Sequence, residues 1–142
     1  MAEAILNYRG RDNFIAYSAG SRPAGAIHPL ALKVLTDAGF DMSGKMPKRM
    51  EEYLNEDFAF IITLCDRMKE ECPIFPGKPI LAHWGMPDPA EFAGAEEEKL
   101  KFFEKTMSDI SERLSLFLSL PMEKLDRMAL ELRIKEIGKV TL

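Results

Sequence analysis

The feature of this sequence that most limits its possible folds is an apolar run at residues 58–64 (FAFIITL). Its side chains are apolar at both alternating positions, which is typical of a strand covered on both faces. Parallel sheets flanked by helices provide such double cover, whereas a strand with one wet face would show strict alternation. The run therefore predicts a buried central strand of an α/β domain.

Helices and shorter strands are predicted on both sides of this run. The longest helix carries apolar residues three or four positions apart, and Glu96, Glu97 and Glu98 complement the positive end of its dipole. The remaining elements follow from start and stop signals such as Pro29 and Gly39. We predict helices over residues 1–9, 29–38, 48–54, 96–120 and 122–137, and further strands over residues 14–20 and 79–82. Strands that alternate with helices indicate a doubly wound α/β fold with a parallel sheet.

Composition excludes several functional classes. The chain has 142 residues, of which 46% are hydrophobic, enough for one domain with its own core. Acidic and basic residues (23 and 19) are interspersed, so we expect neither nucleic acid nor an anionic membrane as partner. No apolar run approaches the ~20 residues of a membrane span, and no signal peptide is visible, so we expect a cytoplasmic protein.

The two cysteines are the first candidates for chemistry. Cys65 follows the apolar run directly, at the sheet edge where α/β proteins place their sites, and a helix beginning there would favour its thiolate. Cys72 lies about 10 Å further along a helix, too far for a disulfide unless the charged segment 66–71 unwinds. Two inert core thiols remain the alternative. The spacing matches neither a CxxC pair nor a zinc site, so we predict no metal.

Asp88 and His83 are the other candidates. Asp88 lies between Pro87 and Pro89, which exclude helix and hold its carboxylate on a loop. It could serve as a general acid if an apolar neighbour such as Trp84 raised its pKa, or it could simply form a turn. His83 could act directly or be a hydrogen-bonded structural residue.

The order of these motifs resembles a known family. The motifs are YSAG (17–20), ITLC (62–65) with CP (72–73), HWG (83–85) and DPA (88–90). Together they resemble the thioredoxin-coupled arsenate reductases, which have the low-molecular-weight tyrosine phosphatase fold. The resemblance runs from residue 1 to about residue 118. It implies an α/β domain over residues 1–118 and a C-terminal helical extension over 119–142, which either covers this domain or meets a partner.

The resemblance implies roles for three residues. In the family, a first cysteine in a phosphate-binding loop attacks arsenate and a second cysteine attacks the adduct, releasing arsenite; a third then takes over the disulfide. By motif, Cys65 is similar to the second cysteine, Cys72 to the third, and Asp88 to the general acid. Thioredoxin or a similar dithiol protein would reduce the Cys65–Cys72 bond, and no bound cofactor is expected. A phosphatase-like hydrolase and a non-catalytic redox or interaction module are the alternatives.

The chain departs from the family at the phosphate loop. The family's first strand and its loop of Cys, five residues and Arg normally precede the segment that here is MAE (1–3). Glu71 and Lys78 stand six residues after the two cysteines, so neither begins such a loop. We therefore expect an N-terminally shortened fold that is inactive alone, with substrate-binding residues unknown. Either the polypeptide begins earlier or the shortening is natural.

A second departure concerns ions. Some relatives bind potassium near a position that here is Lys48, and an ammonium group cannot ligate a cation. Lys48 would instead supply positive charge directly, so we predict no potassium.

Overall fold

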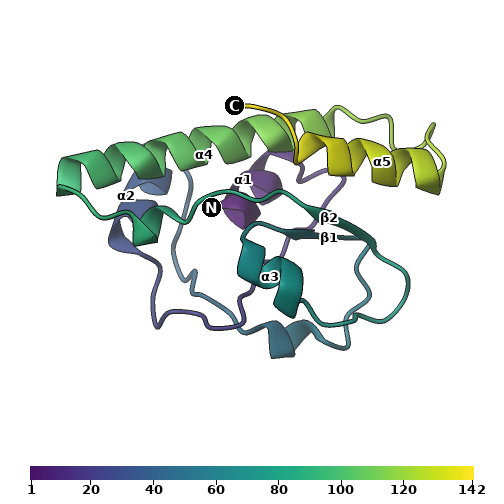
Figure 1. The fold of residues 1–142 in the computed structure, drawn as a ribbon, viewed down its shortest axis with the longest axis horizontal. Coiled ribbons are helices and arrows are strands. Elements are labelled where there is room, and N and C mark those ends of the chain that lie inside the picture. The colour runs from purple at the N-terminus through teal and green to yellow at the C-terminus, as the bar shows by residue number, and fades with distance from the viewer.

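Helices surround a small parallel sheet in the computed structural model, which describes all residues 1–142 (Figure 1). The elements in chain order are α1 (Ala2–Arg9), α2 (Pro29–Asp37), the 3₁₀ turn η1 (Met50–Tyr53), β1 (Phe60–Thr63), α3 (Asp66–Glu71), β2 (Ile80–His83), the 3₁₀ turn η2 (Pro89–Glu91), α4 (Glu96–Leu118) and α5 (Arg127–Ile137). Strands and helices alternate, which confirms the predicted α/β fold class.

The sheet consists of β1 and β2, which pair in parallel. Phe60 lies opposite Ile80 and Thr63 lies opposite His83. Because the strands run the same way, their carboxyl ends meet at one edge of the sheet. That edge carries Thr63 and His83, and Cys65 follows it closely.

The prediction of a strand over residues 14–20 is wrong. This segment pairs with no other strand and forms only an isolated bridge between Gly20 and Arg49. The Asn7 side chain explains part of the difference. Its amide nitrogen donates to the Ala16 carbonyl oxygen at 2.9 Å, and its oxygen accepts from the Ala16 N–H at 2.7 Å. A side chain thus takes both peptide groups that a neighbouring strand would have used.

The expectation that residues 58–64 form a central buried strand is also corrected. β1 has β2 as its one ladder partner, and all four of its residues are half-buried. Its apolar residues are nevertheless covered by aromatic side chains. The Phe60 ring lies 5.3 Å from that of Phe117 and 6.3 Å from that of Phe14. An apolar run shows that a strand is packed against other side chains, but it does not show whether neighbouring strands provide them. Here a helix and a loop do, through Phe117 and Phe14.

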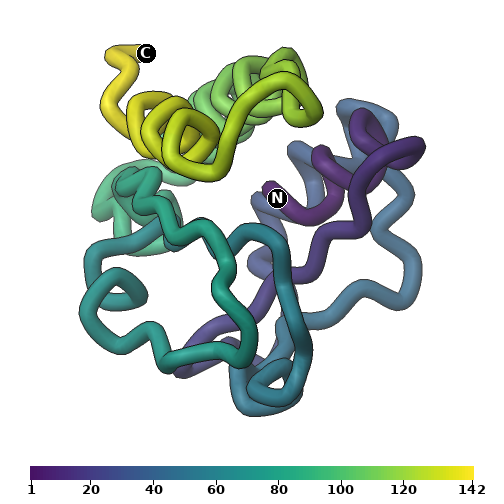
Figure 2. Tube along the Cα trace, turned by 90° about the vertical axis from the view of Figure 1, so that its right-hand side faces the viewer, coloured from purple at the N-terminus to yellow at the C-terminus, as the bar shows by residue number.

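Helices α4 and α5 lie together along one side of the molecule and cover the sheet, α1 and α2 (Figure 1). Turned by 90°, the two C-terminal helices lie above the N-terminal half and the β1–β2 segment, which are side by side beneath them (Figure 2). No helix of the structure combines the length and the apolarity that crossing a bilayer requires.

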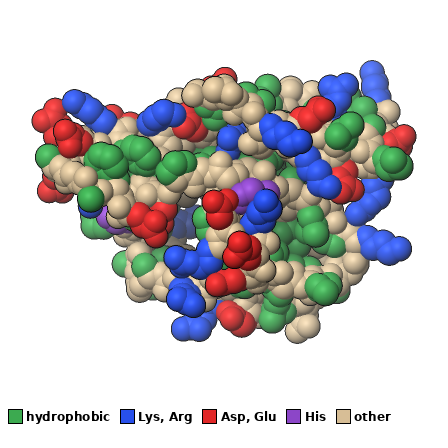
Figure 3. All heavy atoms as spheres, in the orientation of Figure 1, with side chains coloured by type: hydrophobic (Ala, Val, Ile, Leu, Met, Phe, Trp, Pro, Cys, Tyr) green, Lys and Arg blue, Asp and Glu red, His purple; other side chains and the backbone are tan.

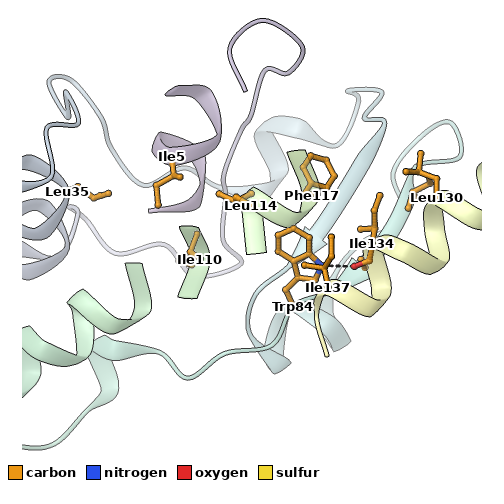
Figure 4. Packing of buried hydrophobic residues seen from close by; sticks show 11 residues of the cluster. Ile5, Leu35, Trp84, Ile110, Leu114, Phe117, Leu130, Ile134 and Ile137 are labelled. Carbon is orange, nitrogen blue, oxygen red and sulfur yellow. Dashed lines mark hydrogen bonds between the residues drawn. The ribbon is translucent and has the colours of Figure 1, made fainter. Parts of the chain in front are cut away.

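The hydrophobic core joins both ends of the chain (Figure 4). Its buried members are Ile5, Leu35, Ile80, Ala82, Trp84, Ile110, Leu114, Phe117, Leu130, Ile134 and Ile137. The last three come from α5, so the predicted extension over residues 119–142 shares the core of the preceding segment. The division after residue 118 itself stays a prediction.

The start of α5 differs from the prediction. Pro121 predicted a helix from about residue 122, but α5 begins at Arg127. The Asp126 carboxylate accepts from the Ala129 N–H at 2.8 Å and so caps the helix. An aspartate N-cap satisfies an otherwise free backbone N–H, which fixes the start at this position.

Arg113 ties α5 to the end of β2. It is 7% exposed, and its guanidinium donates to the carbonyl oxygens of Trp84 (3.0 Å) and Gly138 (3.3 Å). The Trp84 indole N–H donates to the Ile134 carbonyl oxygen at 2.9 Å (Figure 4). A Cβ atom at Gly138 would overlap the backbone of His83. The glycine is thus required by close approach between α5 and β2.

Candidate functional site

The two cysteines lie at opposite ends of α3. Cys65 is its N-cap and Cys72 its C-cap, and both have extended backbone dihedral angles. Both side chains are half-buried free thiols. A helix of six residues is about 9 Å long, and a disulfide requires Cα atoms closer than about 7 Å. The two sulfurs can therefore bond only after α3 unwinds.

Helix α3 is weakly held by its surroundings. None of its residues is buried, and no side chain caps its first turn. Among the regular elements it packs mainly against β1, and one side-chain hydrogen bond joins it to His83 of β2. Segments with few buried apolar contacts open at low free-energy cost. The local structure is therefore compatible with the unwinding that a disulfide between Cys65 and Cys72 would need.

Burial raises the pKa of the Cys72 thiol above its ordinary value. The Sγ atom lies 3.7 Å from the carbonyl oxygen of Pro73, to which the thiol donates a hydrogen bond. Both features favour the neutral thiol over the thiolate. In the folded helix Cys72 is thus a weaker nucleophile than a solvent-exposed cysteine.

A hydrogen-bonded chain of three side chains lies beside Cys65. His83 Nδ1 is 2.8 Å from Thr63 Oγ1, and His83 Nε2 is 3.0 Å from Asp66 Oδ1. An ionised carboxylate only accepts hydrogen bonds, so Nε2 carries the proton that is donated to Asp66. In the neutral ring Nδ1 then accepts from the Thr63 hydroxyl. Both nitrogen atoms of the imidazole are satisfied, as the hydrogen-bonded reading of His83 predicted.

Thr63 and Asp66 were not predicted as partners of His83. The signal that could have found them is the strand register, which places Thr63 opposite His83. Asp66 follows three residues after Thr63, at the first turn of α3. Register in a parallel sheet is set by tertiary packing, so the sequence alone did not supply it.

Asp88 is exposed and directly precedes η2. Its Oδ1 accepts from the Ala90 N–H at 2.9 Å, so Asp88 is the N-cap of η2. Trp84, which could have provided an apolar wall beside Asp88, belongs to the buried core and is 2% exposed. Its indole N–H donates to the Ile134 carbonyl oxygen of α5. The role of Asp88 as an acid stays a prediction.

Lys48 forms an ion pair with Glu3. Its Nζ lies 2.9 Å from Glu3 Oε2, which also accepts from the Ser18 hydroxyl at 2.6 Å. Burial opposes ionisation of Glu3, yet the hydrogen bonds from Ser18 and Lys48 outweigh it and lower the pKa of this carboxyl. The Lys48 ammonium is thus paired with Glu3, which also binds Ser18 of the YSAG segment.

The remaining surface offers no continuous charged patch on the face that carries α3, where acidic and basic side chains alternate (Figure 3). Two open hollows of about 530 and 560 Å³ lie away from the thiols. The first lies at the amino-terminal edge of the sheet, lined by residues such as Phe58 and Arg127. No group of three or more His, Cys, Asp or Glu side chains converges as a metal site would require.

The fold and the site together define an α/β protein with one thiol at the carboxyl edge of a parallel sheet and a second thiol at the far end of the helix that follows. The family model described as "Low molecular weight phosphotyrosine protein phosphatase" matches residues 1–130. The chain belongs to this family, which confirms the fold expected from the sequence motifs.

Individual relatives narrow the comparison. An arsenate reductase of Bacillus licheniformis is 34% identical over 117 residues, which cover 82% of this chain and 84% of that protein. The arsenate reductase of Bacillus subtilis is 32% identical with the same coverage. These similarities confirm the resemblance to arsenate reductases.

Solved structures agree with the fold. A structure described as an arsenate reductase in the reduced state matches 80% of this chain and 82% of its own, with a TM-score of 0.57 and 21% identity. A thioredoxin-dependent arsenate reductase of Corynebacterium glutamicum matches with a TM-score of 0.54 and 27% identity. That match covers 81% of this chain and 54% of the other.

Proposed function

We propose that this chain acts in the reduction of arsenate to arsenite, with Cys65 and Cys72 carrying the oxidising equivalents away. The observation that carries the proposal is a pair of free thiols at the two ends of a weakly held helix. The relatives support it, because those that match over 82% of this chain are arsenate reductases.

The proposed steps balance in atoms and electrons. A primary thiol forms a thiol–arsenate adduct with loss of water; this thiol is a co-reactant, because residues 1–142 contain no Cys-x5-Arg loop. The Cys65 thiolate attacks the sulfur of the adduct, and the electron pair of the broken As–S bond reduces As(V) to As(III). Arsenite leaves. The Cys72 thiolate then attacks Cys65, which frees the primary thiol and forms the Cys65–Cys72 disulfide.

Unwinding of α3 has two effects in this sequence of steps. It allows the sulfurs of Cys65 and Cys72 to meet, and it exposes Cys72 to water. Since burial is what raises the pKa of Cys72, exposure would make this thiol more acidic at the moment when it must attack.

Asp88 is the proposed proton donor to the oxygen that leaves as water when the adduct forms. Its loop position leaves it accessible to a bound oxyanion, and its backbone is fixed by Pro87 and Pro89. A dithiol protein of the thioredoxin type, acting in a reducing compartment such as the cytoplasm, is the proposed reductant of the Cys65–Cys72 bond.

The test measures arsenite formation with thioredoxin, thioredoxin reductase and NADPH. Two samples are compared: residues 1–142 with glutathione as the primary thiol, and the protein expressed with any in-frame codons upstream of Met1. Cys65→Ser and Cys72→Ser should each abolish multiple turnover. Arsenate turnover that persists in Cys72→Ser would refute the cascade.

A matched control exists for the proposed acid. Asp88→Asn should lower the rate by about 10²- to 10⁴-fold. Asp41 is also exposed and also accepts from the backbone N–H two residues later, from Ser43 at 2.9 Å. Asp41→Asn should therefore leave turnover unchanged. Equal effects of the two substitutions would remove Asp88 from the mechanism.

The family description favours a second candidate function, hydrolysis of aryl phosphates. This reaction would need Asp88 and the Cys-x5-Arg loop that residues 1–142 do not contain, but neither Cys65 nor Cys72. Hydrolysis of p-nitrophenyl phosphate that survives in the double Cys→Ser variant, without arsenite formation, would favour it. A Cys65–Cys72 disulfide that cycles with neither activity would indicate a non-catalytic redox module.

A further inference from the structure

One side-chain hydrogen bond joins α3 to the sheet. Asp66, the first residue of α3, accepts from His83 at the end of β2, with 3.0 Å between Oδ1 and Nε2. No other side chain of α3 forms a hydrogen bond or ion pair with another element. The Asp66 side chain is 93% exposed, so this single bond rather than packing fixes its position.

The ring of His83 is held from three sides. Thr63 Oγ1 binds its Nδ1 at 2.8 Å, and the backbone of His83 is part of the β1–β2 pairing. The third constraint is Gly85. A Cβ atom there would lie 2.7 Å from His83 Nε2, closer than real Cβ contacts allow. Only glycine at position 85 therefore leaves the ring where it can reach Asp66.

We propose that His83 is a positioning residue for the thiol pair: through Asp66 it holds the first turn of α3 closed and so favours the dithiol over the Cys65–Cys72 disulfide. Thr63 orients the His83 ring through its hydrogen bond, and Gly85 leaves the space that the ring needs to reach Asp66. The inference rests on the proposed function, in which α3 must open. It also assigns a physical reason to the His-Trp-Gly motif, whose histidine and glycine act on the same bond.

The direction of the effect follows from linkage. A contact present only in the closed dithiol state lowers the free energy of that state and not of the disulfide state. Its loss therefore shifts the equilibrium toward the disulfide. An exposed hydrogen bond to a carboxylate has modest strength, and its loss corresponds to a shift of about two- to fivefold in the equilibrium constant.

The experiment equilibrates residues 1–142 in buffers of reduced and oxidised glutathione. Oxidation of Cys65 and Cys72 to one disulfide transfers two electrons to glutathione disulfide, which becomes two glutathione thiols, and alkylation with mass spectrometry counts the free thiols. The variants are Asp66→Ala, His83→Ala and the double variant. Glu70→Ala is the matched control, because it removes an acidic side chain of α3 that has no partner.

Asp66→Ala and His83→Ala should each shift the equilibrium toward the disulfide by about two- to fivefold. The double variant should shift it no further than the larger single effect, since both remove one contact. Gly85→Ala should behave like His83→Ala. Additive single effects, or an equal shift in Glu70→Ala, would overturn the proposal.

Hydrogen exchange of the α3 amides in the reduced protein separates this inference from the proposed function. Exchange should accelerate by about two- to fivefold in Asp66→Ala and His83→Ala, whether or not the thiols ever pair. Faster exchange without any disulfide would refute the proposed thiol pairing, but it would still show that the Asp66–His83 contact stabilises α3. Unchanged exchange would overturn that stabilisation itself.

Discussion

Replacing Ile134 by alanine tests whether α5 is an integral part of the fold. Ile134 is 0% exposed and packs in the same core as Trp84 and Phe117. The substitution leaves the Ile134 carbonyl in place, so the hydrogen bond from the Trp84 indole can persist. Only the apolar contacts of one side chain are removed.

The magnitude follows from the groups removed. Alanine lacks roughly three methyl or methylene groups of isoleucine, which at about 0.8 kcal/mol each gives about 2.4 kcal/mol. The cavity left behind adds about 1 kcal/mol, so the free energy of unfolding should fall by about 3–4 kcal/mol. With a urea m-value of about 1.5–2 kcal/mol/M, the midpoint should shift by about 2 M.

Urea unfolding should be followed by Trp84 fluorescence and by far-UV circular dichroism. Leu132→Ala is the matched control on the same helix, because Leu132 is 58% exposed; its effect should stay within about 0.5 kcal/mol. Equal midpoints for Ile134→Ala and Leu132→Ala would refute the reasoning. So would a wild-type protein whose helical signal is lost in a separate, earlier transition, since α5 would then melt independently.

Three further outcomes follow from the structure. Gly138→Ala should destabilise by about 1–3 kcal/mol in thermal unfolding, because its Cβ would overlap the backbone of the His-Trp-Gly loop, whereas Gly25→Ala, with no atom within 4 Å, should be nearly neutral. Because the pKa of Glu3 is lowered in the folded state, its ionised form stabilises the fold at pH values above the ordinary glutamate pKa of about 4.3. This contribution is lost as pH falls through the folded-state pKa. Glu3→Gln should therefore make the free energy of unfolding fall less steeply in acid. In a Cys65→Ser background, iodoacetamide should label Cys72 with a pH midpoint above about 8.5, and a midpoint at or below that value would contradict burial of the thiol.

Local signals in the sequence predicted α2 and α4 closely, whereas the helix predicted over residues 48–54 is only the 3₁₀ turn η1. Helix α2 begins at Pro29, and α4 spans Glu96–Leu118 against a prediction of residues 96–120. Caps, prolines and apolar periodicity act within a turn or two of the chain, so they can be recognised without tertiary information. The paired strands were also found, because their apolar residues are contiguous.

Features that depend on distant partners were missed. The segment 14–20 reads as a strand, but its central peptide groups go to Asn7, a side chain that no strand pattern includes. Buried Arg113 carries no local signal, because its partners are carbonyl oxygens more than 20 residues away. Tertiary contacts of this kind override local propensity.

The candidate site was predicted only where it depends on local sequence, and its contacts between distant residues were missed. The position of Cys65 at the start of a helix was predicted because that helix is local, whereas Cys72, which we expected on the same helix, is its extended C-cap residue. The bond between His83 and Asp66 depends on strand register and on the space left by Gly85. Asp88 was placed on its loop, whereas the inward turn of Trp84 depends on α5, which lies 50 residues further along the chain.

The hydrogen bond from Trp84 to Ile134 also has a consequence for biosynthesis. At about 5–20 residues per second, a ribosome needs about 3–10 seconds to make the 50 residues between these partners. During that interval the apolar surface of the sheet that α5 later covers is open to other chains and to chaperones. The synthesis of α5 thus decides how long this surface of the nascent protein is prone to aggregate. Core mutations in α5 should lower the yield of folded protein before they lower its activity.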